Sequence, residues 1–389
     1  MSARLALCAL AVAVLPVASA GASAALPRVD STLPSWLAHG GAATVSGWTG
    51  AAEQVRLVTD HGSTLGRATS GPLGRFTISF RAPLPGRYRL HVAAAEGTAR
   101  AGSLLVRPLV LAAVGDVTFG EQVGGAIQRF GAAYPWRGVA GTLRRADITI
   151  GNLETAVSNG GSAVPDKQYH FRGLPSDLLP VAGFAGFDVL TLANNHTGDF
   201  GTGALLDTLA AVRAAGIVPI GAGADSAAAA QPALLHAGGL TVAVLGRSDV
   251  NPLGFAATAT APGTSRADPL ALARDVSAAR RRADVVVCFF HWGIEGRTAP
   301  TPRQQELANA CLGAGAQVVV GAHPHVFGAV TAPRPHTVVA WTLGNFVFPS
   351  AGVTARTGIL EVELGRSGVT GYRVVPVEID GFSPRLLHG

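Results

Sequence analysis

The sequence predicts a mixed α/β protein in which a small all-β module precedes a larger domain of alternating strands and helices. Residues 26–107 show short alternating strands separated by turn residues, whereas apolar strand segments alternate with helical segments from residue 108 onward. Hydrophobic residues make up 48% of the 389 residues and charged residues only 14%, which excludes an intrinsically disordered chain. The length suits two or three folded domains.

The all-β module is predicted from short segments in which polar and apolar residues alternate. Such a series of strands with turn residues between them is typical of a small β-sandwich of immunoglobulin-like type, here ending at residue 107. The module carries no cluster of acids or histidines, so we interpret it as a spacer or binding module. Its predicted strands are residues 44–48, 54–58, 75–80 and 87–92.

The larger domain, residues 108–389, is predicted to contain a mostly parallel sheet. Its strand segments are continuous apolar runs, which sheets covered on both faces require, and helical segments lie between them. The last two strand segments have no helix between them, so the sheet is expected to finish with antiparallel strands. The predicted strands are residues 109–114, 148–150, 188–192, 242–245, 285–290, 318–320, 359–364 and 372–379, and the clearest helices are 204–215, 268–282 and 303–313.

The first 25 residues are predicted to be an export signal. Arg4 supplies a positive charge, residues 5–17 are apolar, and residues 18–20 or 22–24 offer small side chains for cleavage. The protein is therefore expected to be exported, either secreted or attached to the cell surface. Retention of the segment as an uncleaved anchor is the alternative.

The formal net charge of +6 favours an anionic partner. The positive charge is nearly all arginine scattered along the chain, with Lys167 as the single lysine and no dense basic run. We therefore predict an anionic polymer or cell-surface substrate and no nucleic acid.

Metal-binding side chains follow several predicted strands of the larger domain. Asp116 and Glu154 follow the first two strands, and His291 follows the very apolar strand at 285–290. His323 and His325 follow the strand at 318–320 and are splayed by the proline between them. Taken alone, each of these residues also fits a structural role in a turn or in the hydrophobic core. Because parallel strands present their carboxyl ends at one edge, their conjunction predicts a single metal centre.

The segment after the third strand adds a neutral ligand and an acid-base group. Asn195 offers a carbonyl oxygen to the metal, His196 can act as an acid or a charge-stabilising donor, and Asp199 can orient the imidazole. A polar loop that caps the next helix is the alternative interpretation.

Two further segments suggest substrate contacts. Lys167 and Arg172 together could hold a carboxylate or phosphate, with an exposed loop as the alternative. Asn345 lies near the site rim in an apolar strand, where a structural role is the alternative.

These motifs together resemble the CapA family of capsule synthesis, which is associated with poly-γ-glutamate. Over residues 109–348 the sequence contains, in order, Gly-Asp, Gly-Asn-Leu-Glu, Asn-Asn-His-x-x-Asp, His-Trp-Gly, Gly-x-His-Pro-His and Leu-Gly-Asn-Phe-Val-Phe. That family is similar in fold to the calcineurin-like metallophosphoesterases, so the resemblance implies a layered αββα domain. It also implies His196 as the catalytic imidazole and, as metal ligands, Asp116, Glu154, Asn195, His291, His323 and His325.

The resemblance has two departures. Metallophosphoesterases usually carry a histidine two residues after the first aspartate, where this chain has Thr118, and an aspartate where it has Glu154. Both changes count against phosphatase chemistry and leave a metal centre in place.

The resemblance implies an exported metal-dependent protein that synthesises, anchors or processes an anionic capsule polymer, by hydrolysis or transfer at a γ-glutamyl amide. We expect one or two divalent ions, Mn, Fe or Zn, and membrane-bound polymer synthases as partners. The alternatives are a non-catalytic scaffold that binds polymer or partner proteins, and a phosphodiesterase or phosphatase.

Overall fold

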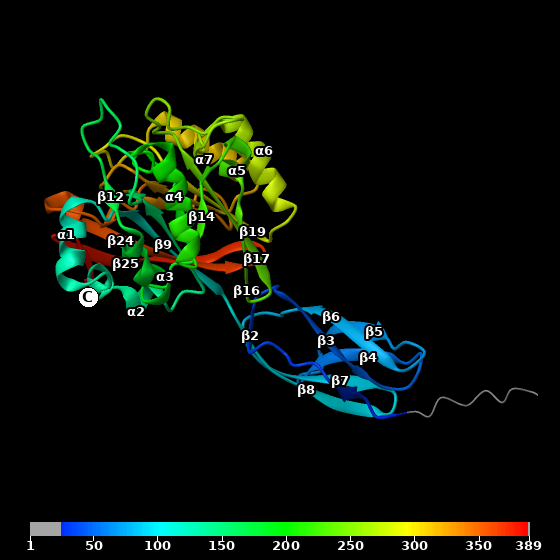
Figure 1. Cartoon of the computed structure of the whole chain (residues 1–389). Coiled ribbons are helices and arrows are strands. Elements are labelled where there is room, and N and C mark those ends of the chain that lie inside the picture. The colour runs from blue at the N-terminus through cyan, green and yellow to red at the C-terminus, as the bar shows by residue number, and fades with distance from the viewer. Residues whose placement is uncertain (1–24, 388–389) are drawn as a thin grey trace, which may run out of the picture. The chain divides into compact units, whose positions relative to one another are not determined.

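The computed structural model describes residues 25–387 (Figure 1), so residues 1–24 of the predicted export signal lie outside the described residues. Internal contacts divide the chain into two compact units. Of the described residues, the first unit contains 25–32, 44–79 and 89–102, and the second contains 33–43, 80–88 and 103–387. Within residues 25–387, no helix combines the length and the apolar character that a membrane crossing requires.

The N-terminal strands form two sheets. In β6 exposed and buried residues alternate throughout, as a strand with one covered face requires. The predicted strands of this region are present as β3, β4, β6 and β7, while the module's boundary at residue 107 stays a prediction. The first sheet has the order β1 (Arg28–Val29), β3 (Ala42–Trp48), β6 (Arg75–Arg81), and the second β2 (Trp36–Ala38), β8 (Gly97–Arg107), β7 (Gly86–Ala94), β4 (Gln54–Thr59), β5 (Thr64–Thr69).

The larger unit contains an eight-stranded sheet in which β9 is central. Strands β14, β13, β10 and β9 are parallel, whereas β24, β25 and β26 continue the sheet antiparallel, as the sequence predicts. The order is β14 (Val218–Ile220), β13 (Val189–Thr191), β10 (Ile148–Leu153), β9 (Leu109–Val117), β24 (Arg356–Gly365), β25 (Gly368–Asp380), β26 (Ser383–Leu386), with β23 (Asn345–Val347) also paired to β9.

A second, six-stranded sheet is mostly parallel. Its order is β16 (Ala233–Ala237), β17 (Leu240–Ser248), β19 (Val285–His291), β20 (Val318–Ala322), β22 (Val338–Ala340), β21 (Val330–Thr331). Its strands β17, β19 and β20 are buried over nearly their whole length, which explains their continuous apolar sequences. Two short strand pairs also form, namely β11 (Ala156–Val157) with β12 (Arg172–Gly173) and β15 (Ala222–Gly223) with β18 (Gly263–Thr264).

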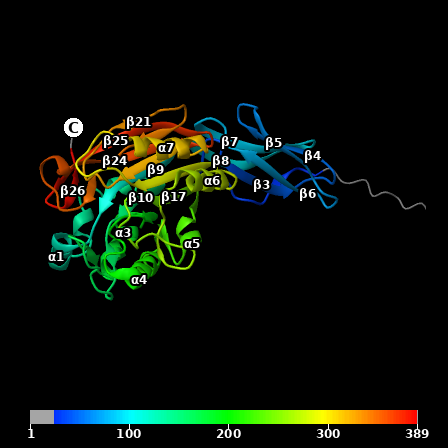
Figure 2. The same ribbon diagram turned by 90° about the horizontal axis from the view of Figure 1, so that it is seen from above.

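Helices cover the outer face of each sheet, and an apolar core fills the space between the sheets. Leu111 and Ile150 of one sheet and Val244 and Val287 of the other belong to this inner core. Figure 2 shows α1, α3 and α4 gathered on one side of β9 and β10. The layered αββα architecture is thus confirmed. The helices are α1 (Glu121–Phe130), α2 (Ala140–Leu143), α3 (Leu179–Gly183), α4 (Gly201–Ala214), α5 (Ser226–Ala230), α6 (Pro269–Arg280) and α7 (Pro302–Gly313).

Local sequence explains where the two helices beside the second sheet begin. The Asp268 side chain accepts the Ala271 N–H at the start of α6, and Thr301 and Gln304 form a reciprocal capping box at the start of α7. Each helix has proline as its first residue, which fixes a helical φ where no hydrogen-bond donor is needed. Both helices therefore begin within two residues of their predicted starts.

Candidate metal centre

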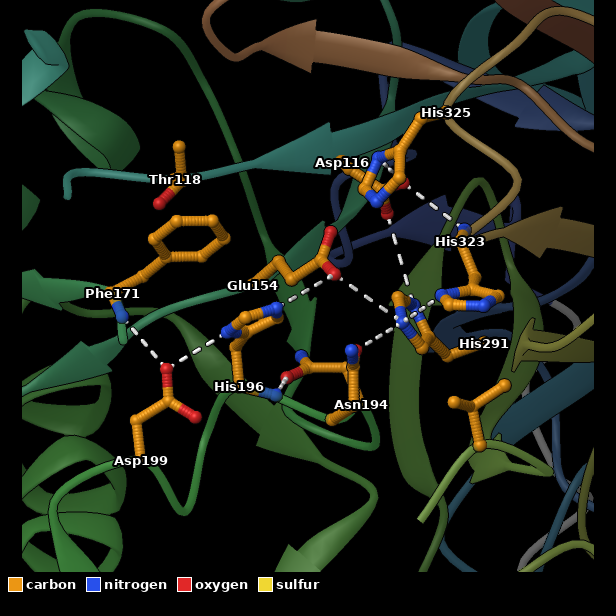
Figure 3. Close-up of polar contacts among 12 residues, drawn as sticks. Asp116, Thr118, Glu154, Phe171, Asn194, His196, Asp199, His291, His323 and His325 are labelled. Atoms are coloured by element: carbon orange, nitrogen blue, oxygen red, sulfur yellow. Dashed lines mark hydrogen bonds and ion pairs between the residues drawn. The ribbon is translucent and has the colours of Figure 1, made fainter. Parts of the chain in front are cut away.

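Polar side chains from both sheets converge at the carboxyl ends of their strands (Figure 3). From the eight-stranded sheet come Asp116, near the end of β9, and Glu154, which directly follows β10. From the six-stranded sheet come His291, the last residue of β19, and His323, which directly follows β20. Asp116, Glu154 and His291 are fully buried. The topology therefore brings together residues that are far apart in the sequence.

Four donor atoms gather around one point beside His291. Its Nε2 lies 2.7 Å from Asn195 Oδ1, 3.1 Å from His323 Nδ1 and 3.4 Å from Glu154 Oε1. Ligands that bind a zinc ion tetrahedrally at about 2.0–2.1 Å lie roughly 3.3 Å from one another. The separations from His323 and Glu154 fall close to this value, whereas the shorter contact with Asn195 has the length of a hydrogen bond.

A second group of donors surrounds Asp116. Its Oδ2 lies 3.4 Å from His325 Nδ1, and its Oδ1 accepts a hydrogen bond of 2.7 Å from Asn152 Nδ2. Two groups of three residues each offer one donor atom per residue, and within a group these atoms lie within 4.8 Å of one another. The groups are Asp116, Glu154, His325 and Glu154, His291, His323. Glu154 belongs to both groups, so its carboxylate would contribute to metal binding in either of them.

The Glu154 carboxylate gives the clearest sign that a cation belongs here. Its side chain is completely buried, and neither of its oxygens accepts a hydrogen bond from the described residues. A buried carboxylate without hydrogen-bond donors is strongly disfavoured unless a positive charge compensates it. The mixed oxygen and nitrogen donors around it suit Mn, Fe or Zn. The residues present therefore fit a divalent metal.

Burial sets the protonation states of the cluster. It lowers the pKa of His291 to about 3 and also lowers the pKa of His323, so both imidazoles are neutral and offer lone pairs at physiological pH. Burial, together with the charge of Glu154, raises the pKa of Asp116 to about 6. Burial opposes protonation of His325, but the carboxylates of Glu154 and Asp116 outweigh it and raise the pKa of His325.

We expect the metal affinity of the metal-free protein to fall as the pH falls. A proton on His325 competes with the metal first, and below pH 6 a proton on Asp116 competes as well, whereas His291 stays neutral down to about pH 3. The association constant should therefore drop by up to about tenfold per pH unit below the raised pKa of His325, and by up to about 100-fold per unit once the pH is also below the pKa of Asp116. Titration calorimetry between about pH 5 and 8 measures this, and an affinity that does not change with pH would contradict it.

Two glycines allow close approaches of backbone to backbone next to the site. A Cβ atom on Gly115 would lie 1.8 Å from the carbonyl oxygen of Gly344, and one on Gly321 would lie 2.2 Å from that of Trp341. At the first of these contacts the Asp116 N–H donates to the Gly344 oxygen at 2.9 Å. The glycines that precede Asp116 and His323 in their motifs are therefore sterically required.

The backbone around Pro324 is held in a conformation that L-residues rarely adopt. The φ angles of His323 and His325 are +93° and +59°. Each such residue costs on the order of 1–3 kcal/mol and persists only where the surroundings hold it. The His323 N–H donates to Asp116 Oδ2 at 3.0 Å, and the Gly296 N–H donates to the Pro324 oxygen at 2.8 Å. This backbone directs both imidazoles into the cluster.

His196 lies at the edge of the cluster and is oriented by Asp199. Its Nδ1 is 2.8 Å from Asp199 Oδ2, and its Nε2 is 4.0 Å from Glu154 Oε1. Because an ionised carboxylate only accepts hydrogen bonds, this contact assigns the proton to Nδ1 and leaves the Nε2 lone pair facing the cluster. The ring stacks on Phe171, with 4.1 Å between centroids, which fixes its plane.

Lys167 belongs to the same network. Its Nζ donates to Asp199 Oδ1 and, at 2.5 Å, to the backbone oxygen of Asn195, and it lies 3.1 Å from His196 Nδ1. The ammonium is therefore bound by protein groups, and it is the positively charged partner of Asp199. That Lys167 holds a carboxylate or phosphate of the substrate stays a prediction.

The other two residues predicted to bind substrate have different surroundings. The Arg172 guanidinium lies 3.7 Å from the centroid of the Phe200 ring and donates to the Gly161 oxygen at 3.0 Å, so these contacts lie outside the cluster. Asn345 Oδ1 lies 2.8 Å from His325 Nδ1. Asn345 is therefore placed to orient His325.

Sequence reasoning gave Asn152 no role toward Asp116, yet its side chain contacts two members of the cluster. Its Nδ2 donates to Asp116 Oδ1 at 2.7 Å and lies 3.2 Å from His291 Nδ1. The register of β10 against β9 places Asn152 directly beside Asp116. A signal was present in the Gly-Asn-Leu-Glu motif, but only the strand pairing identifies the partner.

A cavity of about 580 Å³ lies beside Lys167. Its walls are largely apolar and include Val164, Leu205, Leu253 and Phe255. The Phe255 ring lies 5.4 Å from Lys167 Nζ, so the cavity adjoins the His196 side of the site. It suits an aliphatic portion of a ligand better than a charged one.

Comparisons with known proteins agree with the motifs. Residues 110–350 match the family described as bacterial capsule synthesis protein PGA_cap. The chain is 33% identical over 285 residues to the capsule biosynthesis protein CapA of Bacillus anthracis, covering 71% of this chain and 69% of that protein. It is 33% identical over 274 residues to the PGA biosynthesis protein CapA of Bacillus subtilis (strain 168), covering 70% and 72%.

Likeness to solved structures is weaker. A novel phosphatase from Mycoplasma pneumoniae is 13% identical, with a TM-score of 0.43 over 70% of this chain and 94% of that one. A 5'-nucleotidase precursor from Thermus thermophilus is 16% identical, with a TM-score of 0.44 over 72% and 54%. Similarity at this level says nothing about activity. The match over residues 110–350 and the identity to both CapA proteins show that the chain belongs to the bacterial capsule synthesis protein family PGA_cap.

Proposed function

We propose that the protein is an exported metal-dependent enzyme of capsule polymer synthesis that hydrolyses or transfers a γ-glutamyl amide. The observation that carries this proposal is the buried Glu154 carboxylate, which accepts no hydrogen bond from the described residues and stands between two groups of metal donors. A divalent ion in this cluster, when bound, supplies a Lewis acid and lowers the pKa of a bound water. The names of the relatives, capsule and PGA biosynthesis proteins, support a polyglutamate substrate.

The protein's own residues then manage the proton and the substrate. His196 presents Nε2 toward the cluster, so it can take a proton from a nucleophile or give one to the leaving amine. Asp199 holds the Nδ1 proton, and Lys167 balances the charge of Asp199. This arrangement keeps a single tautomer in place during turnover.

An anionic polymer suits the chain as a whole. The formal net charge of +6 attracts polycarboxylates over a distance, and the scattered arginines offer bidentate contacts to carboxylates. Because the relatives are named as capsule and PGA biosynthesis proteins, we propose membrane-bound polymer synthases as partners.

Replacing His196 by glutamine should separate catalysis from metal binding. A positioned acid-base residue contributes about 10²–10⁴-fold to rate, so His196→Gln should lose that much cleavage of γ-glutamyl oligomers. Its metal content should stay at the wild-type level, because the metal donor groups do not include His196. Chromatography of oligomer products and elemental analysis of the full chain measure the two properties.

His61→Gln is the matched control, since the His61 side chain is 78% exposed. Wild-type cleavage by His196→Gln would refute the proposed role of His196. A wild-type protein that binds metal but cleaves no oligomer would favour the scaffold function, and cleavage of a chromogenic phosphate ester instead would favour a phosphatase.

A further inference from the structure

Glu295 forms a third group of metal donors on the outer side of the cluster. A carboxylate oxygen of Glu295 and one ring nitrogen each of His323 and His325 lie within 4.8 Å of one another. Glu295 is exposed, unlike Asp116 and Glu154. The group therefore faces solvent while sharing two imidazoles with the buried donors.

The backbone brings Glu295 to these imidazoles through a tight reversal. Gly293 and Gly296, with φ angles of +94° and +73°, flank the segment that carries it. The Gly296 N–H donates to the Pro324 oxygen at 2.8 Å, which ties this segment to the histidine loop. The backbone that carries Glu295 is thus tied to the histidine loop, which brings the carboxylate within reach of His325.

The segment after β9 offers no histidine to complete the Asp116 group, because Thr118 stands at that position. Thr118 is buried, and its Oγ1 accepts the Gly120 N–H at 3.1 Å, so the hydroxyl serves the local turn. Asp116 is then grouped with the buried Glu154 and the partly exposed His325. An ion bound by His325 would gain a further ligand from Glu295, whose carboxylate lies beside the same imidazole.

We propose that Glu295 is a ligand of a second divalent ion, which it binds together with His325 and His323. This inference rests on the proposed metal centre and extends it to a second, more exchangeable position. A hard carboxylate with imidazoles suits Mn, Fe or Zn. Because Glu295 faces solvent, the remaining coordination positions stay open to water or to an oxygen of the substrate.

The test compares metal stoichiometry and affinity in full-length wild type, Glu295→Gln and Glu378→Gln. Glu378 is also exposed and lies on β25, so its substitution removes the same charge outside the cluster. Protein stripped with a chelator is titrated with Mn²⁺ and followed by calorimetry and by the electron paramagnetic resonance of bound Mn²⁺. We expect two ions per chain in wild type and Glu378→Gln, and a second ion bound about tenfold or more weakly in Glu295→Gln, with the first unchanged.

Other outcomes separate this inference from the metal centre itself. Two ions bound with wild-type affinities in Glu295→Gln would overturn it, as would a wild type that binds a single ion, and in both cases the buried centre would stand. A wild type that binds no ion would overturn the metal centre and this inference together.

Discussion

Glu154→Gln should lose metal and activity while the fold persists. The substitution keeps the shape of the side chain but removes the charge that two groups of donors share. Metal affinity should fall by about 100-fold or more, and activity with it, because a metal contributes several kcal/mol to the transition state. The metal-free variant should be at least as stable as metal-free wild type, since a buried carboxylate without hydrogen-bond donors has been neutralised.

Thermal unfolding with and without Mn²⁺ measures both effects. A ligand at 100 times its dissociation constant stabilises a protein by about 2.7 kcal/mol, so wild type should melt at a higher temperature with metal and Glu154→Gln should not. Glu378→Gln, an exposed substitution of the same chemistry, should respond as wild type does. A metal-dependent shift of wild-type size in Glu154→Gln would show that the carboxylate does not bind the ion.

Lys167→Met should destabilise the protein by about 3–5 kcal/mol. The Asp199 side chain is fully buried, the Lys167 side chain is 16% exposed, and their ion pair supplies the positive charge next to Asp199. Removing one partner of a buried pair leaves an uncompensated charge, which accounts for the size of the loss. Urea unfolding of the metal-free proteins measures it, and Lys167→Met combined with Asp199→Asn should recover part of the stability.

The matched control is Arg385→Met, because Arg385 and Asp380 form an ion pair in which both side chains are more than half exposed. Exposed pairs contribute roughly 0–1 kcal/mol, so this variant should stay close to wild type. A loss below about 1 kcal/mol in Lys167→Met would mean that Asp199 is satisfied by its other donors, such as the Phe171 N–H at 2.7 Å.

The site could be predicted from the sequence where it depends on strand ends. Asp116, Glu154, His291 and His323 follow apolar runs, and parallel strands bring their carboxyl ends to one edge. Glu295 could not be found this way. It reaches the cluster because its loop reverses at glycines and pairs with the histidine loop, and this pairing has no local sequence pattern.

Lys167 shows a second limit. The role of this single lysine in binding substrate stays a prediction, but the contacts of its ammonium with Asp199 and the Asn195 backbone could not be predicted. Whether a loop side chain faces outward or folds back depends on which buried charge it meets, and Asp199 lies 32 residues further along the chain.

In the fold, too, features marked by local sequence could be predicted and features set by distant contacts could not. Helices α6 and α7 could be predicted because aspartate, threonine and proline mark their starts. The two-residue pairs β11 with β12 and β15 with β18 could not be predicted. Such short strands depend on partners that the tertiary structure supplies and not on local propensity. Sheet order likewise depends on packing between distant segments, as in the pairing of β24 with β9.

The donors come from both sheets, Asp116 and Glu154 from one and His291 and His323 from the other. A bound ion would therefore act as a cross-link between the two halves of the core. Sliding of one sheet past the other would break coordination before it exposed apolar surface. Amide hydrogen exchange should consequently slow together in β9 and β20 when metal binds, although no hydrogen bond of either strand changes partner.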